Sequence, residues 1–396
     1  MTGVRFESLK GHIRSTKRIR QVGRVMQVVG TIIEAQLPGV AVGAIANVGD
    51  TQAEVVGFRE NRALLMPLGS LHGISHGDPV RVCDEALTLP VGDALLGRVI
   101  DPLGVPLDGR PLRDATERRS LLSSPPAAMN RSRIKRPLPT GVRAIDGLLT
   151  LGEGQRVAIM AGSGVGKSTL LGMVAQNSQA DVNVVCLVGE RGREVREFLE
   201  RDLGPEGLAR SVVIVATSDR APVILVKAVQ AALSVAEHFR DDGKRVLLMV
   251  DSLTRLAMAQ RQIGLAAGEP PATRGYTPSV FTMLPRLLER AGPGEGKGSI
   301  TAVTTVLVEG DDMDDPVADT VRGIVDGHIV LSRRLASHGH YPAIDVLESV
   351  SRTMTSTSPV EQVQAAHVIR DLMATWRENE ELIPEAARDV PGNGGA

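Results

Sequence analysis

The stretch QRVAIMAGSGVGKSTLL, residues 155–171, decides the fold of this chain. Its first part is apolar and contains the β-branched residues Val157 and Ile159, which predicts a buried strand. Three glycines then interrupt the apolar run, and we expect a helix to begin at Lys167. A strand, a glycine-rich loop and a helix in this order are typical of a phosphate-binding loop, whereas a chance glycine-rich turn would lack that context.

This loop offers three kinds of group to a nucleoside triphosphate. Its glycines let backbone N–H groups point at phosphate oxygens, and the helix N-terminus adds its positive dipole end. Lys167 is expected to reach the β- and γ-phosphates, and the hydroxyl of Ser168 to ligate Mg²⁺. Ala161 replaces the first glycine of the pattern G-x-x-x-x-G-K-[ST], but it precedes the cradle itself. We therefore predict nucleotide binding by Gly162, Ser163, Gly164, Val165, Gly166, Lys167, Ser168 and Thr169.

Length and composition narrow the class of protein. The 396 residues are enough for two or three domains, and 45 Lys+Arg against 46 Asp+Glu favour neither a nucleic-acid nor a membrane partner. The two cysteines, Cys83 and Cys186, indicate neither a disulfide framework nor a zinc site. No apolar run reaches ~18 residues and the N-terminus has no apolar signal region, so we expect a soluble, cytoplasmic protein.

The first 20 residues are basic. Phe6, Leu9 and Ile13 fall at helical spacing, which predicts an amphipathic basic helix that binds an acidic lipid surface or a partner helix. A solvated arm is the alternative.

Residues 21–95 contain short strand-like runs separated by glycine-rich turn signals, which predicts a small β-barrel. RNA-binding barrels stack bases on aromatic side chains, and this segment has only Phe58. We interpret the barrel as a structural or assembly collar.

Residues 96–355 are predicted to form the nucleotide-binding domain, with a turn-rich connector at 96–150 that includes a solvated basic run at 131–136. Strands and helices then alternate, which predicts an α/β domain with a mostly parallel sheet. Active groups in such sheets collect at the carboxyl ends of the strands. We expect further strands at residues 184–188, 212–216, 246–250, 300–308 and 329–331, and helices at 193–200 and 222–239.

Asp251 closes the apolar strand at 246–250. With Lys167 upstream, an aspartate in this place is the usual holder of the Mg²⁺ shell. The alternative is an N-cap for a helix that begins near Leu253, and the two roles are compatible.

Glu190 follows the strand at 184–188. A carboxylate just past a strand end can orient and polarise the water that attacks the γ-phosphate, and the neighbouring Arg191 can pair with phosphate. A surface salt bridge among alternating charges is the alternative for Glu190.

Three remaining features carry less weight. The acidic run at 311–315 lacks the pattern of a calcium loop and indicates a solvated turn. His338 and His340 have no third ligand in view, so a zinc site is not expected. Residues 356–396 are predicted to form a short helical C-terminal region with a disordered tail.

Several stretches together resemble the ATPase of the bacterial type III export apparatus, in its flagellar or injectisome form. That family is similar to the catalytic subunit of rotary ATP synthases. The resemblance covers roughly residues 20–380. It rests on AGSGVGKS at 161–168, GERGRE at 189–194, DSLTR at 251–255, GEPPATRGY at 268–276, TVLVEGDD at 305–312 and HYPAID at 340–345.

The resemblance implies a RecA-like P-loop domain and assigns roles to three further residues. It favours Glu190 as the catalytic carboxylate, implies that Tyr341 stacks on adenine, and implies that Arg352 is an arginine finger reaching into the neighbouring subunit. A homohexameric ring would repeat a complete site at each interface. The implied activity is Mg²⁺-dependent ATP hydrolysis coupled to protein translocation, with flagellar export preferred and injectisome secretion as the alternative.

The family also implies partners. These are a stator-like regulator at the N-terminal arm, a coiled-coil stalk protein, chaperone–substrate complexes and the membrane export gate, with a cytoplasmic position peripheral to the inner membrane. After Ile383 the family continues with a longer helical end than this chain shows, which leaves stalk and chaperone binding open.

Two other functions compete with this one. A non-catalytic regulatory subunit of a rotary ATPase would typically lack the carboxylate at Glu190. An RNA translocase is disfavoured by the aromatic-poor barrel and the near-zero net charge.

Overall fold

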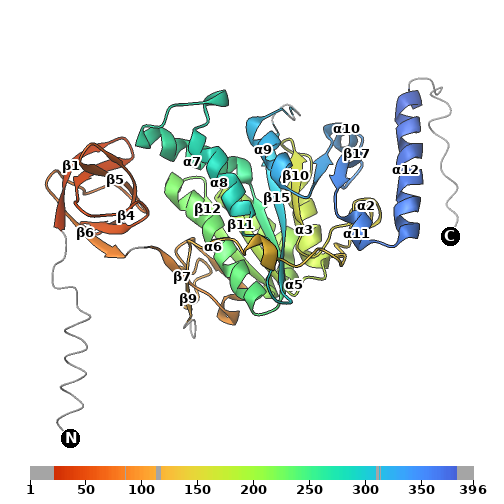
Figure 1. Ribbon diagram of the computed structural model, residues 1–396, viewed down its shortest axis with the longest axis horizontal. Coiled ribbons are helices and arrows are strands. Elements are labelled where there is room, and N and C mark those ends of the chain that lie inside the picture. The colour runs from red at the N-terminus through yellow and green to blue at the C-terminus, as the bar shows by residue number, and fades with distance from the viewer. Residues whose placement is uncertain (1–21, 85, 113–116, 309–311, 313, 381–396) are drawn as a thin grey trace, which may run out of the picture.

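The computed structural model describes residues 22–84, 86–112, 117–308, 312 and 314–380. Figure 1 shows a β-barrel at one end, an α/β domain in the middle and the long helix α12 (Val360–Asn379) at the other end. This confirms the predicted fold class. The predicted basic arm at 1–20 and the tail from 381 lie outside the described residues.

The barrel is a closed sheet of six antiparallel strands in the order β1-β2-β5-β4-β3-β6. Its interior is filled by small and branched aliphatic side chains such as Val25, Ile33 and Val55. Strand β3 was not predicted, because its segment IANV has only four residues and barely alternates in polarity. The six strands are β1 (Val22–Val29), β2 (Ile32–Gln36), β3 (Ile45–Val48), β4 (Thr51–Arg59), β5 (Arg62–Pro67) and β6 (Pro79–Asp84).

The α/β domain is built on one large sheet whose strand order is β17-β16-β10-β15-β13-β11-β12-β8. All neighbours along this path are parallel except β16 and β17. The strands are β8 (Arg98–Ile100), β10 (Arg156–Ala161), β11 (Val182–Glu190), β12 (Ser211–Thr217), β13 (Arg245–Asp251), β15 (Ser299–Leu307), β16 (Gly327–Leu331) and β17 (Ile344–Ser351), with β14 (Gly292–Pro293) paired to β15 and a separate pair β7 (Thr88–Pro90) and β9 (Arg118–Ser120).

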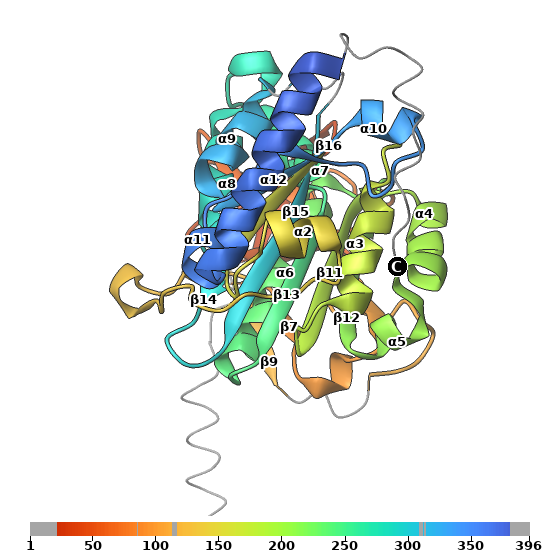
Figure 2. The same cartoon turned by 90° about the vertical axis from the view of Figure 1, so that its right-hand side faces the viewer.

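Helices cover both faces of this sheet (Figure 2). Side chains alternate between the faces: Val184 and Cys186 join one apolar core and Val185 and Leu187 the other. The first core is completed by α6 (Pro222–Asp241), α7 (Leu253–Ala267), α8 (Pro278–Leu288) and α9 (Pro316–Ile324); the second by α2 (Arg143–Leu148), α3 (Lys167–Asn177), α4 (Gly192–Glu197), the π-helical η3 (Phe198–Leu203), α5 (Gly204–Ala209) and α10 (Arg333–Ser337).

Among the described helices, α6 alone is long and apolar enough to cross a membrane by length and composition. Within this fold 83% of its apolar window is buried. It packs on β11, β12 and β13, as the central helix of a layered domain does.

Two expectations for the connector at 96–150 are wrong in part. Residues 98–100 form β8, which extends the main sheet beside β12 instead of a turn. Arg131, expected on a solvated run, has a side chain only 17% exposed and pairs with Glu289 at 3.1 Å. The Arg131 guanidinium also donates to the backbone carbonyls of Glu289 and Ala291, about 160 positions away in sequence. Contacts over such a separation are not indicated by the sequence.

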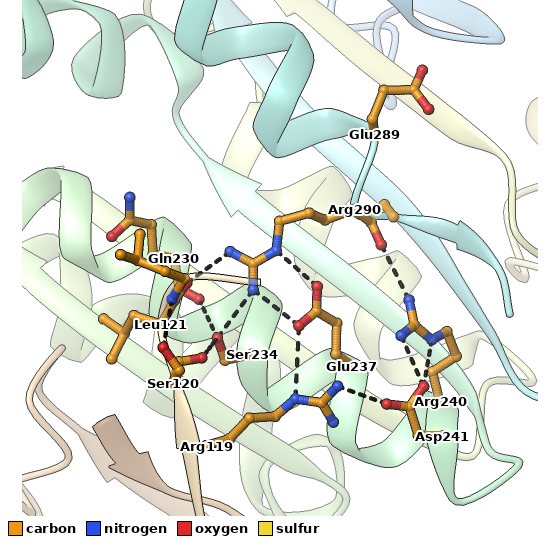
Figure 3. Close-up of polar contacts among 12 residues, drawn as sticks. Arg119, Ser120, Leu121, Gln230, Ser234, Glu237, Arg240, Asp241, Glu289 and Arg290 are labelled. Carbon is orange, nitrogen blue, oxygen red and sulfur yellow. Dashed lines mark hydrogen bonds and ion pairs between the residues drawn. The ribbon is translucent and has the colours of Figure 1, made fainter. Parts of the chain in front are cut away.

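A buried ionic cluster joins the connector to α6 and to the turn after α8 (Figure 3). Arg290 and Glu237 have side chains 3% and 1% exposed and lie 2.7 Å apart. Arg290 also donates to the Ser234 hydroxyl at 3.0 Å and to the Leu121 carbonyl at 2.9 Å. The guanidinium therefore donates to four acceptor atoms of three residues on two other segments, which compensates its desolvation.

Replacing Arg290 by methionine should destabilise the α/β domain strongly. The change leaves Glu237 buried, with only Arg119 at 3.8 Å as an ionic neighbour, and loss of one partner of a buried pair costs about 3–5 kcal/mol. Urea unfolding followed by circular dichroism measures the shift. The control is Arg196→Met, which removes the exposed i,i+4 pair with Glu200 and should leave the midpoint unchanged. Equal midpoints for both variants would contradict the assignment.

Candidate active site

The phosphate-binding loop lies between β10 and α3, as predicted. Gly164 and Gly166 have φ of 79° and 90°, in the left-handed region that favours glycine. Gly166 is the residue that immediately precedes α3, so the loop turns directly into the helix N-terminus. Ser163 and Gly164 are exposed at the tip, and Val165 is buried beneath it.

Lys167 and Asp251 are brought into direct contact, although 84 positions separate them in sequence. The Lys167 ammonium donates a short hydrogen bond to Asp251 Oδ1, and the Thr305 hydroxyl donates to the same oxygen at 2.8 Å. Both partners are largely buried, with side chains 12% and 5% exposed. The contact arises because β10, β15 and β13 are parallel neighbours, so that their carboxyl ends lie side by side.

Asp251 is not the N-cap of α7, which was the alternative role for this aspartate. Ser252 precedes α7, and its hydroxyl accepts from the Arg255 N–H at 3.4 Å. The Asp251 carboxylate is left to face Lys167 and Thr305. Its Oδ2 makes no hydrogen bond to the described residues.

Glu190 ends β11, the strand beside β13, and its side chain is only 13% exposed. It lies 3.4 Å from the Arg255 Nε and faces the carboxyl group of Glu194. The surroundings are therefore those of a partly buried cluster at the sheet edge. They do not match the exposed surface bridge that was the alternative.

The pKa of Glu190 is raised to about 7, chiefly by burial. The hydrogen bond with Glu194 and the negative charge of Asp251 contribute to this rise, whereas the cations Lys167 and Arg255 oppose it. The same hydrogen bond lowers the pKa of the more exposed Glu194. A carboxyl group with a pKa near neutrality is suited to exchanging protons with water.

Arg255 is a member of this cluster that the sequence analysis did not single out. An ideal Cβ at Gly189 would lie 2.7 Å from Arg255 Cδ, so glycine at 189, with φ of 70°, makes room for the arginine. The signal was present: Arg255 follows Asp251 by four positions, in the first turn of a helix that begins at the same sheet edge.

Tyr341 and Arg191 occupy the rim. The Tyr341 ring is packed on the loop backbone, 3.5 Å from an ideal Cβ at Gly166, and 61% of the residue is exposed. The Arg191 side chain is 73% exposed and pairs with Glu194 at 3.4 Å.

Arg352 is far from this cluster. It follows β17, which runs antiparallel to β16, and its N–H donates to the Asp326 carbonyl at 3.0 Å. Asp326 in turn bonds Arg156, the first residue of β10. The phosphate-binding loop follows the last residue of β10, roughly 20 Å along the strand. Arg352 is exposed and its side chain has no partner among the described residues.

The donors at the site fit a Mg²⁺ ion that is shared with phosphates. The described residues contain no cluster of three or more His, Cys, Asp or Glu side chains that could hold a metal alone. Mg²⁺ is usually held by one or two protein oxygens, several waters and substrate phosphates. The Ser168 hydroxyl at the start of α3 and the uncommitted Asp251 Oδ2 are oxygen ligands of that kind.

Comparison with known proteins gives the family. Residues 141–351 match the nucleotide-binding domain of the ATP synthase alpha/beta family, and residues 25–83 match its beta-barrel domain. The flagellum-specific ATP synthase of Bacillus subtilis is 51% identical over 96% of this chain and 88% of the relative. The type 3 secretion system ATPase of Xanthomonas euvesicatoria is 53% identical over 92% of this chain and 84% of the relative.

A solved structure agrees with these relatives. The assembled ATPase EscN of the enteropathogenic E. coli type III secretion system superimposes with a TM-score of 0.87 at 47% identity, covering 91% of this chain and 88% of EscN. EscN has also been solved in complex with its central stalk EscO, with a TM-score of 0.85 at 46% identity, covering 94% of this chain and 90% of EscN. The chain therefore belongs to the ATP synthase alpha/beta family, in the group of the flagellum-specific ATP synthases and the type 3 secretion system ATPases.

Proposed function

We propose that this protein hydrolyses ATP with Mg²⁺, as a homohexameric ring that drives type III protein export. The observation that carries the proposal is the meeting of Lys167, Asp251 and Glu190 at one sheet edge, directly behind the phosphate-binding loop. The flagellar and injectisome relatives are about equally similar, at 51% and 53% identity, so the proposal covers both systems.

The residues divide the chemistry among them. Backbone N–H groups of the loop and the Lys167 ammonium bind the phosphates, and Tyr341 stacks on the base. Glu190, as a carboxylate, orients and polarises the attacking water. Mg²⁺, when bound by Ser168 and Asp251, neutralises charge that develops on the phosphoryl oxygens.

Arg352 acts in the neighbouring subunit. Within its own chain, Arg352 lies near the amino ends of the parallel strands, whereas Lys167 lies near their carboxyl ends. The Arg352 side chain has no partner among the described residues. A guanidinium delivered across an interface stabilises the transition state only when subunits are assembled. We assign Arg191 a supporting role in phosphate binding, for which its side chain would have to leave Glu194.

We infer the partners from the relatives of this chain. EscN has been solved as an assembled ATPase and in complex with its central stalk EscO, and we propose the same assembly and a coiled-coil stalk here. A stator-like regulator at the N-terminal arm, chaperone–substrate complexes and the export gate complete the proposed set. The protein would work in the cytoplasm, peripheral to the inner membrane, and without nucleic acid.

Lys167→Ala and Glu190→Gln should fail in different ways. Lys167 contacts ground-state phosphates, so its loss should weaken nucleotide binding. Glu190 acts on the attacking water, so Glu190→Gln should bind nucleotide normally and lose ~10²–10⁴-fold in kcat. Titration with a fluorescent nucleotide and steady-state phosphate release measure both effects. The exposed Glu206→Gln serves as the matched control. Wild-type turnover in Glu190→Gln would remove Glu190 from its role.

The rate should depend on pH through Glu190. Its carboxylate form is the active one and its pKa is about 7, so kcat/KM should fall as the pH drops below about 7 and level off above it. Initial rates between about pH 5.5 and 8.5 give the profile. Because phosphate groups titrate nearby, nucleotide affinity of Glu190→Gln over the same range is the control. A profile flat down to pH 5.5 would show that Glu190 is not the titrating group.

Mixing two inactive variants tests the interface. Arg352→Ala should lose ~10³–10⁵-fold in kcat, and Lys167→Ala should be nearly inactive. In mixed rings some interfaces join an intact Lys167 to an intact Arg352, so ATPase activity should partly return. Arg143→Ala, an exposed arginine elsewhere, is the control and should keep full activity. Mixed rings that are verified by cross-linking yet stay inactive would show that Arg352 does not act across the interface.

A further inference from the structure

A groove of about 760 Å³ lies at the junction of the barrel and the nucleotide-binding domain. Strand β4 forms one wall, helices α6, α7 and α8 and residues 122–124 form the others, and none of the lining residues belongs to the candidate active site. Aliphatic side chains, among them Val55, Val223, Val226, Ile263 and Leu287, line the groove together with a similar number of polar and charged side chains. Its size and its combination of apolar surface with polar groups are typical of sites for small molecules.

One positive charge in this groove is unmatched. Lys227 is paired with Glu54 at 2.8 Å, and Figure 3 shows Arg290 engaged with Glu237 and Ser234. Arg286, on α8, is exposed and has no hydrogen-bond or ion-pair partner among the described residues. An arginine that is free beside an apolar groove is suited to binding a carboxylate in bidentate geometry.

Two buried acceptors of the lining residues are also unmatched. Glu54 is 8% exposed, and while its Oε1 accepts from Lys227, its Oε2 is buried without a partner. Gln230 Oε1, one helical turn along α6 from Lys227, is likewise buried without a partner. Buried acceptors are nearly always satisfied in folded proteins, so this pair indicates a hydrogen-bond donor that belongs here.

We propose that this groove binds a small amphipathic carboxylate, whose apolar body fills the groove, whose N–H or O–H reaches Glu54 or Gln230, and whose carboxylate pairs with Arg286. A polyanion such as a nucleotide does not fit, because Arg286 is the one groove cation left uncommitted among the described residues and Glu54 and Glu269 line the same space. A ligand without a charge would leave Arg286 unused.

Indole-3-butyrate has the required groups and serves as the probe. Isothermal titration of the full chain should give a Kd below about 1 mM, the range expected for a ligand of this size. Arg286→Gln should weaken binding ~10–100-fold, because a charge-assisted contact is lost, whereas Arg143→Gln should not change it. The 1-methyl analogue, which lacks the N–H, should bind several-fold more weakly than the probe.

Two further measurements locate the probe. Thr282→Trp places a large side chain on the exposed α8 wall of the groove and should abolish binding without unfolding the protein, as checked by circular dichroism. Saturating MgATP should leave probe binding unchanged. The proposal is overturned if the probe does not bind, if Arg286→Gln binds it as tightly as the wild type, or if MgATP displaces it. None of these outcomes bears on ATP hydrolysis at the loop.

Discussion

Parallel pairing of β10, β15, β13 and β11 is the constraint on which the active site depends. Parallel strands end at a common edge, so Lys167 after β10, Asp251 at the end of β13 and Glu190 at the end of β11 meet there. Both faces of these strands are buried under helices. A slip of one residue would turn each strand's side chains to the wrong core, so the register of the sheet is fixed by packing on two sides.

The charge balance at that edge explains the state of each group. One buried cation, Lys167, is shared by two carboxylates, and its ammonium bonds Asp251 directly. Glu190 is buried, with the weaker contact to Arg255 at 3.4 Å and a second carboxyl group beside it. Burial and the hydrogen bond with that carboxyl group raise the pKa of Glu190 towards neutrality, while the same hydrogen bond lowers the pKa of Glu194. In the function that we propose, bound phosphates would take over the Lys167 ammonium and release Asp251 Oδ1, whereas Asp251 Oδ2 already makes no hydrogen bond to the described residues.

The parts of this site that were predicted from the sequence are those formed by residues close together in the chain. The glycine loop, the strand before it and the strand that ends at Asp251 follow from periodicity and turn chemistry alone, and the mostly parallel sheet follows from their alternation. Long-range pairings were not readable: β8 joins the sheet through a partner more than 100 positions away, and Arg131 finds its carbonyls about 160 positions away. The environment of Glu190 likewise depends on distant residues, since β11 lies between β12 and β13 and Glu190 lies 3.4 Å from Arg255.

The antiparallel strand β17 separates Arg352 from the phosphate-binding loop of the same chain. Because β17 is antiparallel to β16, it begins near the loop with Tyr341 and ends at the far edge with Arg352. A single subunit therefore presents its binding loop and its free arginine on different parts of its surface, and neither can complete the other. Two different surfaces that complement each other make a head-to-tail interface, which closes into a ring or continues as a filament. In the ring that we propose, every interface would contain one loop and one arginine, so the rate of hydrolysis would depend on contacts between subunits. That dependence would give the ring a means of passing the state of one site to the next.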